Sequence, residues 1–355
     1  MQAFEPDKSN GRSDSTFRIL DANFNRAREA LRVVENYARF CLDSSHLTAR
    51  LKDIRHRLRQ AVELLDAGLL LESRDTDLDV GTSISVPEEF QRTTTEDVVT
   101  SNLKRLQESL RTLEEFSKPI SPEAASIIEQ IRYESYTLEK VMLLAQARRP
   151  KLEQALLYVI VTESIGKGRP APQIARDAVA GGADIIQLRE KDRSGRDLLQ
   201  LASEVCEVTH EGGALFIVND RPDIALLSHA DGVHLGQEDI PLRQVRRLVG
   251  DEMIIGISTR NKEQAIAAER NGADYIGVGP VYETATKPGR RPAGLDHVRF
   301  VSKNIQIPHF AIGGLHIENI GAVLDAGARA ICVCSEIIAA DDVEAAARSF
   351  KEVLK

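Results

Sequence analysis

The sequence lacks several features that define whole classes of proteins. Its 355 residues contain no apolar run that approaches the ~18 residues of a membrane span. Residues 1–16 are polar and have no apolar core of the signal-peptide kind, so we expect a disordered tail there. Positively charged residues are also fewer than negatively charged ones, so the formal net charge is −8 and the pI is about 5.6. This balance argues against a partner that is nucleic acid or an anionic membrane.

Cysteine is scarce, and its spacing predicts no metal site. The four cysteines all lie in apolar periodic segments: Cys41, Cys206, Cys332 and Cys334. We interpret them as buried free thiols in a reducing compartment, and therefore expect a cytoplasmic protein. The N-terminal half also lacks the GxxxxGK[ST] motif, so it gives no support for a P-loop kinase.

The composition that is present, 42% hydrophobic and 28% charged residues, is typical of a soluble globular protein with room for two domains. Residues 17–150 carry a helical period, which predicts an all-α N-terminal domain. Two apolar stripes carry this period: Ala27, Leu31, Val34, Ala38 and Cys41, then Leu51, Ile54, Leu58, Val62 and Leu65.

This half contains an internal repeat. Residues 23–37 and 102–116 share the pattern N-x-x-R-x-x-E-x-L-R-x-x-E-x-aromatic, and an Ile-Arg pair follows each copy at 54–55 and 131–132. Duplicated helical hairpins, forming a roughly four-helix unit, explain the repeat with one assumption. The repeated Asn, Arg and Glu side chains either pair between the two copies or line a polar pocket at the pseudo-two-fold axis.

The sequence pattern changes in residues 151–355, where short β-rich runs alternate with helical patterns. The expected strands are 156–162, 185–189, 215–219, 232–235, 254–258, 275–279, 309–312 and 330–334. Eight such units predict an α/β fold of the (β/α)8 TIM barrel type, with a doubly wound sheet as the alternative. In these barrels the chemistry lies at the C-terminal strand ends.

The end of the second expected strand carries an unusual group of polar residues. Three polar side chains alternate with period two and therefore share a face: Gln187, Arg189 and Lys191. Three apolar side chains can face a core: Ile185, Ile186 and Leu188. Two cations and an amide suit a phosphate group, although an exposed strand end with solvated charges also fits this stretch when it is considered alone.

Other strand ends supply further anion and metal ligands. Asp220 and Asp239 are oxygen donors without His or Cys neighbours, which suits Mg2+, although each could instead cap the following helix. Gly313-Gly314 and Ser335 fit a terminal phosphate site, although a tight turn also explains the glycines. Arg189, Lys191 and Lys287 can neutralise a diphosphate. No hydrolase-type Cys–His, Ser–His or paired-carboxylate arrangement is evident, so the site suits ionisation of a leaving group.

With these strand-end residues taken together, residues 151–355 resemble the thiamine phosphate synthase family over their whole length. The matching segments are QLREK (187–191), ND (219–220), GVHLGQED (232–239), GIST (256–259), GPVYETATK (279–287), AIGG (311–314) and CVCSEI (332–337). The resemblance implies a transferase that couples 4-amino-5-hydroxymethyl-2-methylpyrimidine diphosphate to a thiazole phosphate, carboxylated or not. Its products would be thiamine phosphate and diphosphate.

The resemblance also implies residue roles. The pyrimidine diphosphate would be held by Gln187, Leu188, Arg189, Glu190, Lys191, Asn219, Ser258 and Lys287, with Arg189, Lys191, Ser258 and Lys287 catalytic. The thiazole phosphate would be held by Thr284, Ala285, Thr286, Gly314, Cys334 and Ser335, and Mg2+ by Asp220 and Asp239. Cys334 stands where the family pattern has an aliphatic residue. We expect Glu190 to point away from its neighbours and pair with barrel cations.

The implied mechanism is dissociative: diphosphate leaves with the help of Mg2+ and three cations, and the thiazole nitrogen attacks the resulting pyrimidinylmethyl cation. Two rivals remain open, a thiazole tautomerase on the same barrel and a regulatory barrel that only binds thiamine precursors. The acidic pair and the full QLREK and TATK segments would be unnecessary for the tautomerase.

Residues 17–150 resemble a domain found ahead of thiamine phosphate synthases in cyanobacterial-type proteins. Two roles are open for it, a pyrimidine phosphate kinase and a dimerisation or docking module. The expected ligands of the whole chain are small molecules, and a homo-oligomer is compatible with the sequence.

Overall fold

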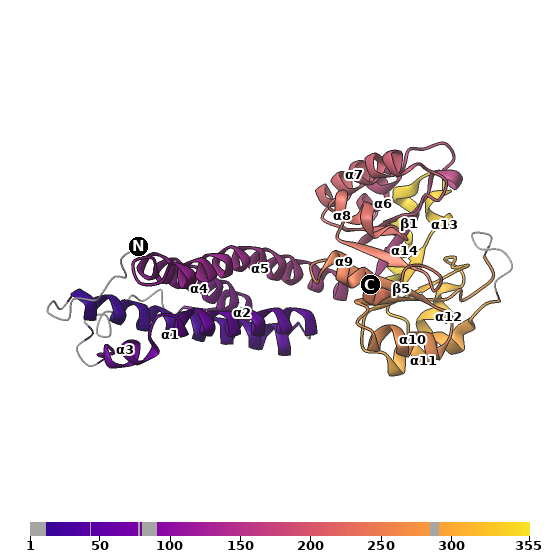
Figure 1. Ribbon diagram of the computed structural model, residues 1–355. Helices are drawn as coiled ribbons and strands as arrows, with labels where there is room; N and C mark the ends of the chain where they lie inside the picture. Colours follow the sequence, from indigo (N-terminus) through magenta and orange to yellow (C-terminus); the bar gives the residue numbers. More distant parts are fainter. Residues whose placement is uncertain (1–11, 43, 77–78, 80–90, 285–290) are drawn as a thin grey trace. The chain divides into compact units, whose positions relative to one another are not determined.

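The chain folds into two compact units, Met1–Gln146 and Ala147–Lys355 (Figure 1). The computed structural model describes residues 12–42, 44–76, 79, 91–284 and 291–355. None of the helices in these parts of the chain is long and apolar enough to cross a membrane.

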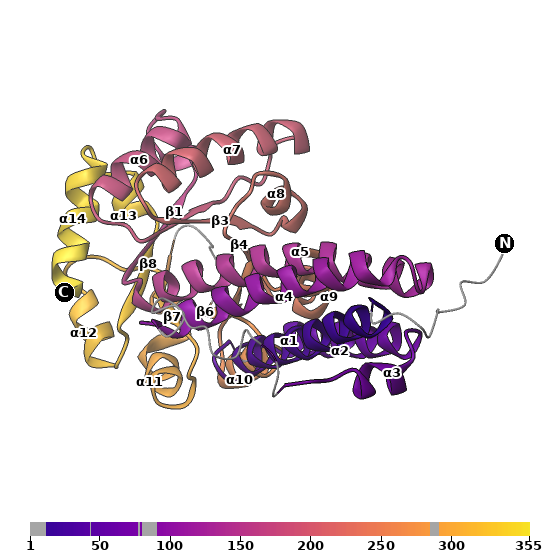
Figure 2. The ribbon, with the colours of Figure 1, turned by 90° about the vertical axis from the view of Figure 1, so that its left-hand side faces the viewer.

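The first unit is helical, as the sequence predicts. Its helices are α1 (Arg12–Phe40), α2 (Ser45–Glu63), α3 (Ala67–Glu72), α4 (Thr95–Ser117) and α5 (Pro122–Gln154), the last of which continues into the second unit. Side chains cap several helix starts: Ser44 accepts the Leu47 N–H of α2, Asp66 accepts the Gly68 and Leu69 N–H groups of α3, and Thr94 and Asp97 form a reciprocal capping box on α4. The first helices of the two repeats, α1 and α4, pack along each other (Figure 2).

The two predicted apolar stripes form the core of this unit, with one exception. Leu31, Val34, Leu51 and Leu58 are each at most 1% exposed. Cys41 is exposed, so its prediction as a buried thiol is wrong. The reason is local: α1 ends at Phe40, and the next residue no longer follows the helical stripe.

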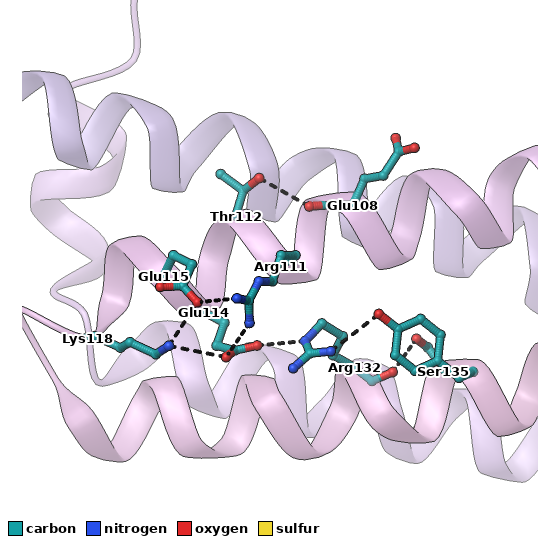
Figure 3. Close-up of polar contacts among 9 residues, drawn as sticks. Glu108, Arg111, Thr112, Glu114, Glu115, Lys118, Arg132 and Ser135 are labelled. Carbon is teal, nitrogen blue, oxygen red and sulfur yellow. Dashed lines mark hydrogen bonds and ion pairs between the residues drawn. The ribbon is translucent and has the colours of Figure 1, made fainter.

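The repeated glutamates pair inside their own hairpins. In the second copy, the carboxylate of Glu114 is 2% exposed and accepts from Arg132 Nε at 2.6 Å and from Arg111 Nη1 at 3.0 Å (Figure 3). In the first copy, Arg55 Nε lies 3.2 Å from Glu35 Oε2. Pairing of these glutamates between the two copies, one of the two alternatives, is therefore wrong, because the Ile-Arg helix of each hairpin supplies the cation.

The repeated asparagines also have local partners. Asn23 donates to the carbonyl of Ile19 at 2.9 Å, and Asn102 donates to the carbonyl of Val98 at 2.7 Å. Each bond joins residues four apart on one helix. Contacts within single helices and hairpins thus involve the asparagine and the second glutamate of each copy.

The second unit is a closed barrel of eight parallel strands in the order β1 to β8. The strands are β1 (Leu157–Val161), β2 (Ile185–Leu188), β3 (Leu215–Asn219), β4 (Gly232–Leu235), β5 (Ile254–Thr259), β6 (Tyr275–Val278), β7 (His309–Ile312) and β8 (Ala330–Val333). Because β1 pairs with β8, the sheet closes and the doubly wound alternative is wrong. The predicted TIM barrel is confirmed.

Helices surround the strands, as Figures 1 and 2 show. They are α6 (Ala171–Ala180), α7 (Gly195–Glu211), α8 (Pro222–Leu227), α9 (Leu242–Val249), α10 (Lys262–Arg270), α11 (Gly294–Asn304), α12 (Ile320–Asp325), α13 (Ser335–Ile338) and α14 (Val343–Leu354), with a 3-10 turn η3 (Glu163–Ile165) after β1. Outward strand side chains such as Ile186 and Leu188 pack in this helical layer.

Inward side chains form a separate core inside the barrel, which contains Ile185, Tyr275 and Phe310 among others. Side chains alternate along a strand, so Ile185 shares its inward face with Gln187, which is 1% exposed. The prediction that Ile185 faces away from Gln187 is therefore wrong, because a barrel strand is buried on both faces. The strand also ends at Leu188, one residue earlier than predicted.

Three aspartates close the opposite, N-terminal end of the barrel. Each precedes an even-numbered strand and accepts a backbone N–H from the preceding strand: Asp184 from Leu157 at 2.9 Å, Asp231 from Phe216 at 2.9 Å, and Asp274 from Ile255 at 2.7 Å. Each also meets a cation, respectively Lys351, Arg148 and Arg246. These contacts fix the strand starts and thereby the register that places the opposite ends.

The pair of His210 and Asp231 predicts a pH dependence of stability. The hydrogen bond from His210 Nε2 to Asp231 Oδ2, 2.7 Å long, raises the pKa of His210 from 6.5 to about 10. A raised pKa means that the stabilisation is complete below pH 6.5 and is lost as the pH rises towards 10. Because 42% of the His210 side chain is exposed, screening by solvent should reduce the contribution of this pair to the free energy of unfolding to about 1 kcal/mol.

We therefore expect the melting temperature of the barrel to fall more steeply between pH 7 and pH 10 in the wild type than in His210→Gln. Differential scanning calorimetry at several pH values measures this. His56→Gln, on the exposed face of α2, is the matched control and should keep the wild-type slope. Equal slopes in the wild type and His210→Gln would refute the assignment.

Candidate active site

A cavity of about 290 Å3 opens at the C-terminal ends of the barrel strands. Many of the side chains predicted for the site line it together: Gln187, Arg189, Lys191, Asn219, Asp220, Asp239, Ser258, Thr284, Gly314, Cys334 and Ser335. These residues come from segments spread over more than a hundred positions of sequence, and barrel closure brings them to one place.

Two members of the QLREK segment do not line the cavity. Leu188 points outward and is 1% exposed within the helical layer. Glu190 Oε1 accepts the backbone N–H of Glu163 at 2.6 Å. The expectation that Glu190 pairs with barrel cations is wrong for the described residues: the carboxylate instead ties the end of β2 to the turn after β1. Of the remaining predicted residues, Ala285, Thr286 and Lys287 lie outside the described residues.

The two predicted metal-binding aspartates lie close enough to affect one another. Burial raises the pKa of Asp220, and the neighbouring carboxylate of Asp239 raises it further, while Lys191 acts in the opposite direction. Lys191 Nζ is 3.6 Å from Asp220 Oδ2. A cation bound beside Asp220 would counteract this rise in its pKa and stabilise the charged carboxylate.

Neither aspartate caps the helix that follows it. Helices α8 and α9 both begin without a side-chain cap, so the capping alternative is wrong. Asp239 Oδ2 instead accepts the N–H of Gly236 at 2.6 Å, which orders the loop after β4. Asp220 has φ of +59°, a left-handed conformation that Asp adopts more easily than most residues. Its N–H donates to the carbonyl of His234 at 2.9 Å.

Amide and cationic groups stand beside this pair. Gln187 Nε2 donates to Asn219 Oδ1 at 3.5 Å, so the two amides of β2 and β3 face one another. The charge of Arg189 acts to lower the pKa of Cys334, the residue after β8. Burial outweighs this and raises the pKa of the Cys334 thiol to about 11. The thiol is therefore neutral near pH 7 and unsuited to nucleophilic attack.

The glycines after β7 are required by their backbone. Gly313 and Gly314 have φ of +102° and +65°, in the left-handed region. A Cβ added to Gly314 would lie 2.5 Å from the carbonyl oxygen of Glu283, so no larger residue fits without movement. Asn319 Nδ2 donates to the Gly314 carbonyl at 2.8 Å and holds the turn beside Ser335 in the same cavity.

Several cavity residues were not predicted from the sequence. Tyr158, His234 and Tyr275 lie at its floor, and Arg260, His316 and Glu336 also line it. One signal could have revealed part of this set: Gly256 interrupts the apolar run of β5, and a glycine inside a strand often marks a close approach. Here the ring of Tyr275 occupies the space that a Gly256 side chain would take.

The two family models that match the chain divide it into two parts. The model described as thiamine monophosphate synthase matches residues 157–337, and the ThiD2 family model matches residues 18–141. The thiamine-phosphate synthase of Gloeobacter violaceus is 45% identical over 92% of this chain and 93% of its own length. That of Nostoc punctiforme is 42% identical over 92% of this chain and 90% of its own.

The barrel also resembles solved structures. The thiamine phosphate pyrophosphorylase from Pyrococcus furiosus is 36% identical, with a TM-score of 0.53, and covers 58% of this chain and 96% of its own. The two cyanobacterial relatives match along nearly the whole chain, whereas this archaeal structure matches little more than half of it.

Proposed function

Since the chain belongs to the thiamine monophosphate synthase family, it is a transferase that condenses a pyrimidine and a thiazole moiety to thiamine phosphate, and we propose that it does so by dissociative loss of diphosphate. One observation supports this best. The cavity joins a cationic and amide-lined side at β2 and β3 to a glycine turn and a serine at β7 and β8. Two phosphorylated substrates can therefore meet within one pocket.

The residues fit a bound Mg2+. Asp220 and Asp239 provide two carboxylates, and burial together with the neighbouring Asp239 raises the pKa of Asp220, a shift that a bound cation would oppose. Among the described residues no group of three or more His, Cys, Asp or Glu side chains forms a metal site. Mg2+ commonly takes only one or two carboxylates and completes its shell with phosphates and waters. When bound, it would supply charge neutralisation for the leaving diphosphate.

The chain's own residues would carry the remaining roles. Arg189 and Lys191 bind the diphosphate as charge develops on its oxygens, and Gln187 and Asn219 orient it. Lys287 is proposed as a third cation from the sequence resemblance alone. Ser258 hydrogen-bonds to the pyrimidine-bearing substrate. The turn at Gly314 and the N–H and hydroxyl groups near Ser335 hold the phosphate of the thiazole, with Thr284 beside them. Fixing this phosphate places the thiazole nitrogen for attack.

The direct assay supplies pyrimidine diphosphate, thiazole phosphate and Mg2+ to the full chain and measures thiamine phosphate and diphosphate. We expect the two products in a one-to-one ratio. EDTA should reduce both rates at least ~10-fold, and excess Mg2+ should restore them, because two carboxylates would otherwise face the anionic leaving group. Full turnover in EDTA would contradict the proposed metal role.

The same assay separates the two rivals. A thiazole tautomerase would change the thiazole phosphate without consuming the pyrimidine diphosphate. A regulatory barrel would bind both compounds and release no diphosphate. Asp220 and Asp239 favour the transferase over the tautomerase, which would not need a carboxylate pair beside a diphosphate.

The helical unit keeps the two roles that the sequence predicts, a pyrimidine phosphate kinase or a dimerisation module. Supplying the full chain with pyrimidine monophosphate, ATP, Mg2+ and thiazole phosphate distinguishes them. Thiamine phosphate formed from the monophosphate requires a kinase step on the same chain. A monophosphate that stays unchanged, together with a dimer that dissociates when the unit is removed, supports the second role. Cytoplasmic location and the expected absence of nucleic-acid partners stay predictions.

A further inference from the structure

A line of four hydrogen-bonding side chains runs from the cavity into the barrel interior. Ser258 Oγ lies 2.9 Å from His234 Nε2, and His234 Nδ1 lies 2.9 Å from Tyr275 Oη. Tyr275 Oη lies 2.9 Å from Tyr158 Oη. Only Ser258 and His234 are partly exposed, since Tyr275 is 0% and Tyr158 is 2% exposed.

The strand register explains how His234 and Tyr275 meet. Gly256 of β5 is aligned with His234 on one side and with Tyr275 on the other. A Cβ on Gly256 would lie 2.4 Å from Tyr275 Oη and 2.0 Å from its ring. The absent side chain of Gly256 therefore lets the Tyr275 hydroxyl cross β5 and reach the imidazole. The packing holds both rings in this arrangement, because they lie only 5.5 Å apart between centroids.

The direction of the hydrogen bonds follows from Tyr158, the residue that ends this line in the barrel interior. Each tyrosine has one hydroxyl hydrogen to donate. If His234 carried a proton on Nδ1, it would donate to Tyr275, and Tyr275 would donate to Tyr158. The Tyr158 hydrogen would then turn to the Cys332 thiol, the other polar group that acts on this hydroxyl. Sulfur is a weak acceptor, and a poorly satisfied buried donor is costly.

The opposite direction avoids this cost. Tyr158 donates to Tyr275, Tyr275 donates to His234 Nδ1, and His234 donates from Nε2 to Ser258 Oγ. No buried hydrogen then lacks a strong acceptor, and the Ser258 hydroxyl hydrogen points towards the cavity. A doubly protonated imidazole fails for the same reason as the Nδ1 form, because Tyr275 would again have to donate towards Tyr158.

We propose that the Tyr158–Tyr275 pair holds His234 as the neutral tautomer protonated on Nε2, and that this makes the Ser258 hydroxyl an obligatory donor to the ligand. The identity of this ligand rests on the proposed function: the group that accepts the hydrogen bond from Ser258 is a ring nitrogen or a phosphate oxygen of the pyrimidine diphosphate. His234, Tyr275 and Tyr158 act through Ser258 and are therefore positioning residues.

The test is nitrogen-15 NMR of the full chain labelled at histidine, without substrates and at neutral pH. His234→Gln identifies the His234 signals by their disappearance. We expect a proton on Nε2 and none on Nδ1 in the wild type, and the same in Tyr158→Phe, where Tyr275 can still donate. Tyr275→Phe removes the donor to Nδ1, so the Nδ1 nitrogen signal should shift as its hydrogen bond is lost. Tyr133→Phe, an exposed position of α5, is the matched control.

A proton on His234 Nδ1 in the wild type would overturn the proposal, and so would an unchanged Nδ1 signal in Tyr275→Phe. Kinetics give a second readout. Tyr275→Phe should lower kcat/KM for the pyrimidine diphosphate about tenfold, the scale of one hydrogen bond, and leave KM for the thiazole phosphate unchanged. The double variant Tyr275→Phe/Ser258→Ala should be no slower than Ser258→Ala alone; additive losses would count against the proposal. If the wild type makes no thiamine phosphate, the proposed function fails, and the NMR result alone decides this inference.

Discussion

Asp220→Asn is expected to slow turnover at saturating substrates by at least ~10²-fold, the scale of a lost electrostatic contact to a developing charge. Asparagine has nearly the same shape and tolerates the backbone of this position, where φ is +59°. The substitution therefore removes the charge and leaves the loop in place. With Asp239 as the only carboxylate of the pair, the site should bind Mg2+ more weakly, and the Mg2+ concentration for half-maximal rate should rise.

Asp223→Asn is the matched control, because it changes the same residue type in the same segment. Asp223 pairs with Arg221 at the surface with 52% of its side chain exposed, and it does not line the cavity. It should keep turnover within about twofold of the wild type, as expected for an exposed ion pair. Near-normal turnover of Asp220→Asn at limiting Mg2+ would remove Asp220 from the proposed metal site.

Gly314→Ala is expected to raise KM for the thiazole phosphate by about 10²-fold, with little change in KM for the pyrimidine diphosphate. The backbone at Gly314 has φ of +65°, and the added Cβ would meet the Glu283 carbonyl oxygen and the Tyr282 side chain at 2.5 and 2.8 Å. The turn must shift, and the N–H groups proposed to hold the terminal phosphate move with it. Steady-state kinetics with each substrate varied in turn measures the effect.

Gly321→Ala tests whether any glycine substitution in this region has the same effect. Gly321 lies in α12, and a Cβ there meets nothing within 4 Å. It should retain both KM values and gain slightly in stability, because alanine favours helix. An equal rise in both KM values for Gly314→Ala would point to general unfolding. An unchanged KM for the thiazole phosphate would contradict the assignment of this turn.

The sequence predicted the barrel closely because its strands are continuous apolar runs bounded by turns. The boundaries of β3, β4 and β7 agree with the expected ranges, and those of β2 differ by one residue. The Asp220 and Asp239 pair was predictable for a related reason: once the strands are placed, residues just after them share one end of the barrel. Barrel topology brings the two aspartates together, which their spacing in the sequence alone does not predict.

The missed features depend on details that one sequence does not encode locally. The contact of Tyr275 with His234 requires the register of three strands and the missing side chain of Gly256 between them. Pairing of Glu114 with Arg132 depends on how two helices pack within one hairpin. A repeat motif shows which residues recur, but it does not show whether they pair within a copy or between copies.

The central claim is that the cavity ionises the pyrimidine diphosphate before the thiazole attacks, and positional isotope exchange tests it most directly. The pyrimidine diphosphate carries oxygen-18 in the bridge between carbon and phosphorus, and the wild type is incubated with it, thiazole phosphate and Mg2+ until part has reacted. If diphosphate leaves first and recombines, phosphorus-31 NMR of the recovered substrate will show the label in non-bridging positions. We predict this scrambling, and we predict that it slows in Asp220→Asn. A label that stays in the bridge while thiamine phosphate forms would contradict the dissociative account.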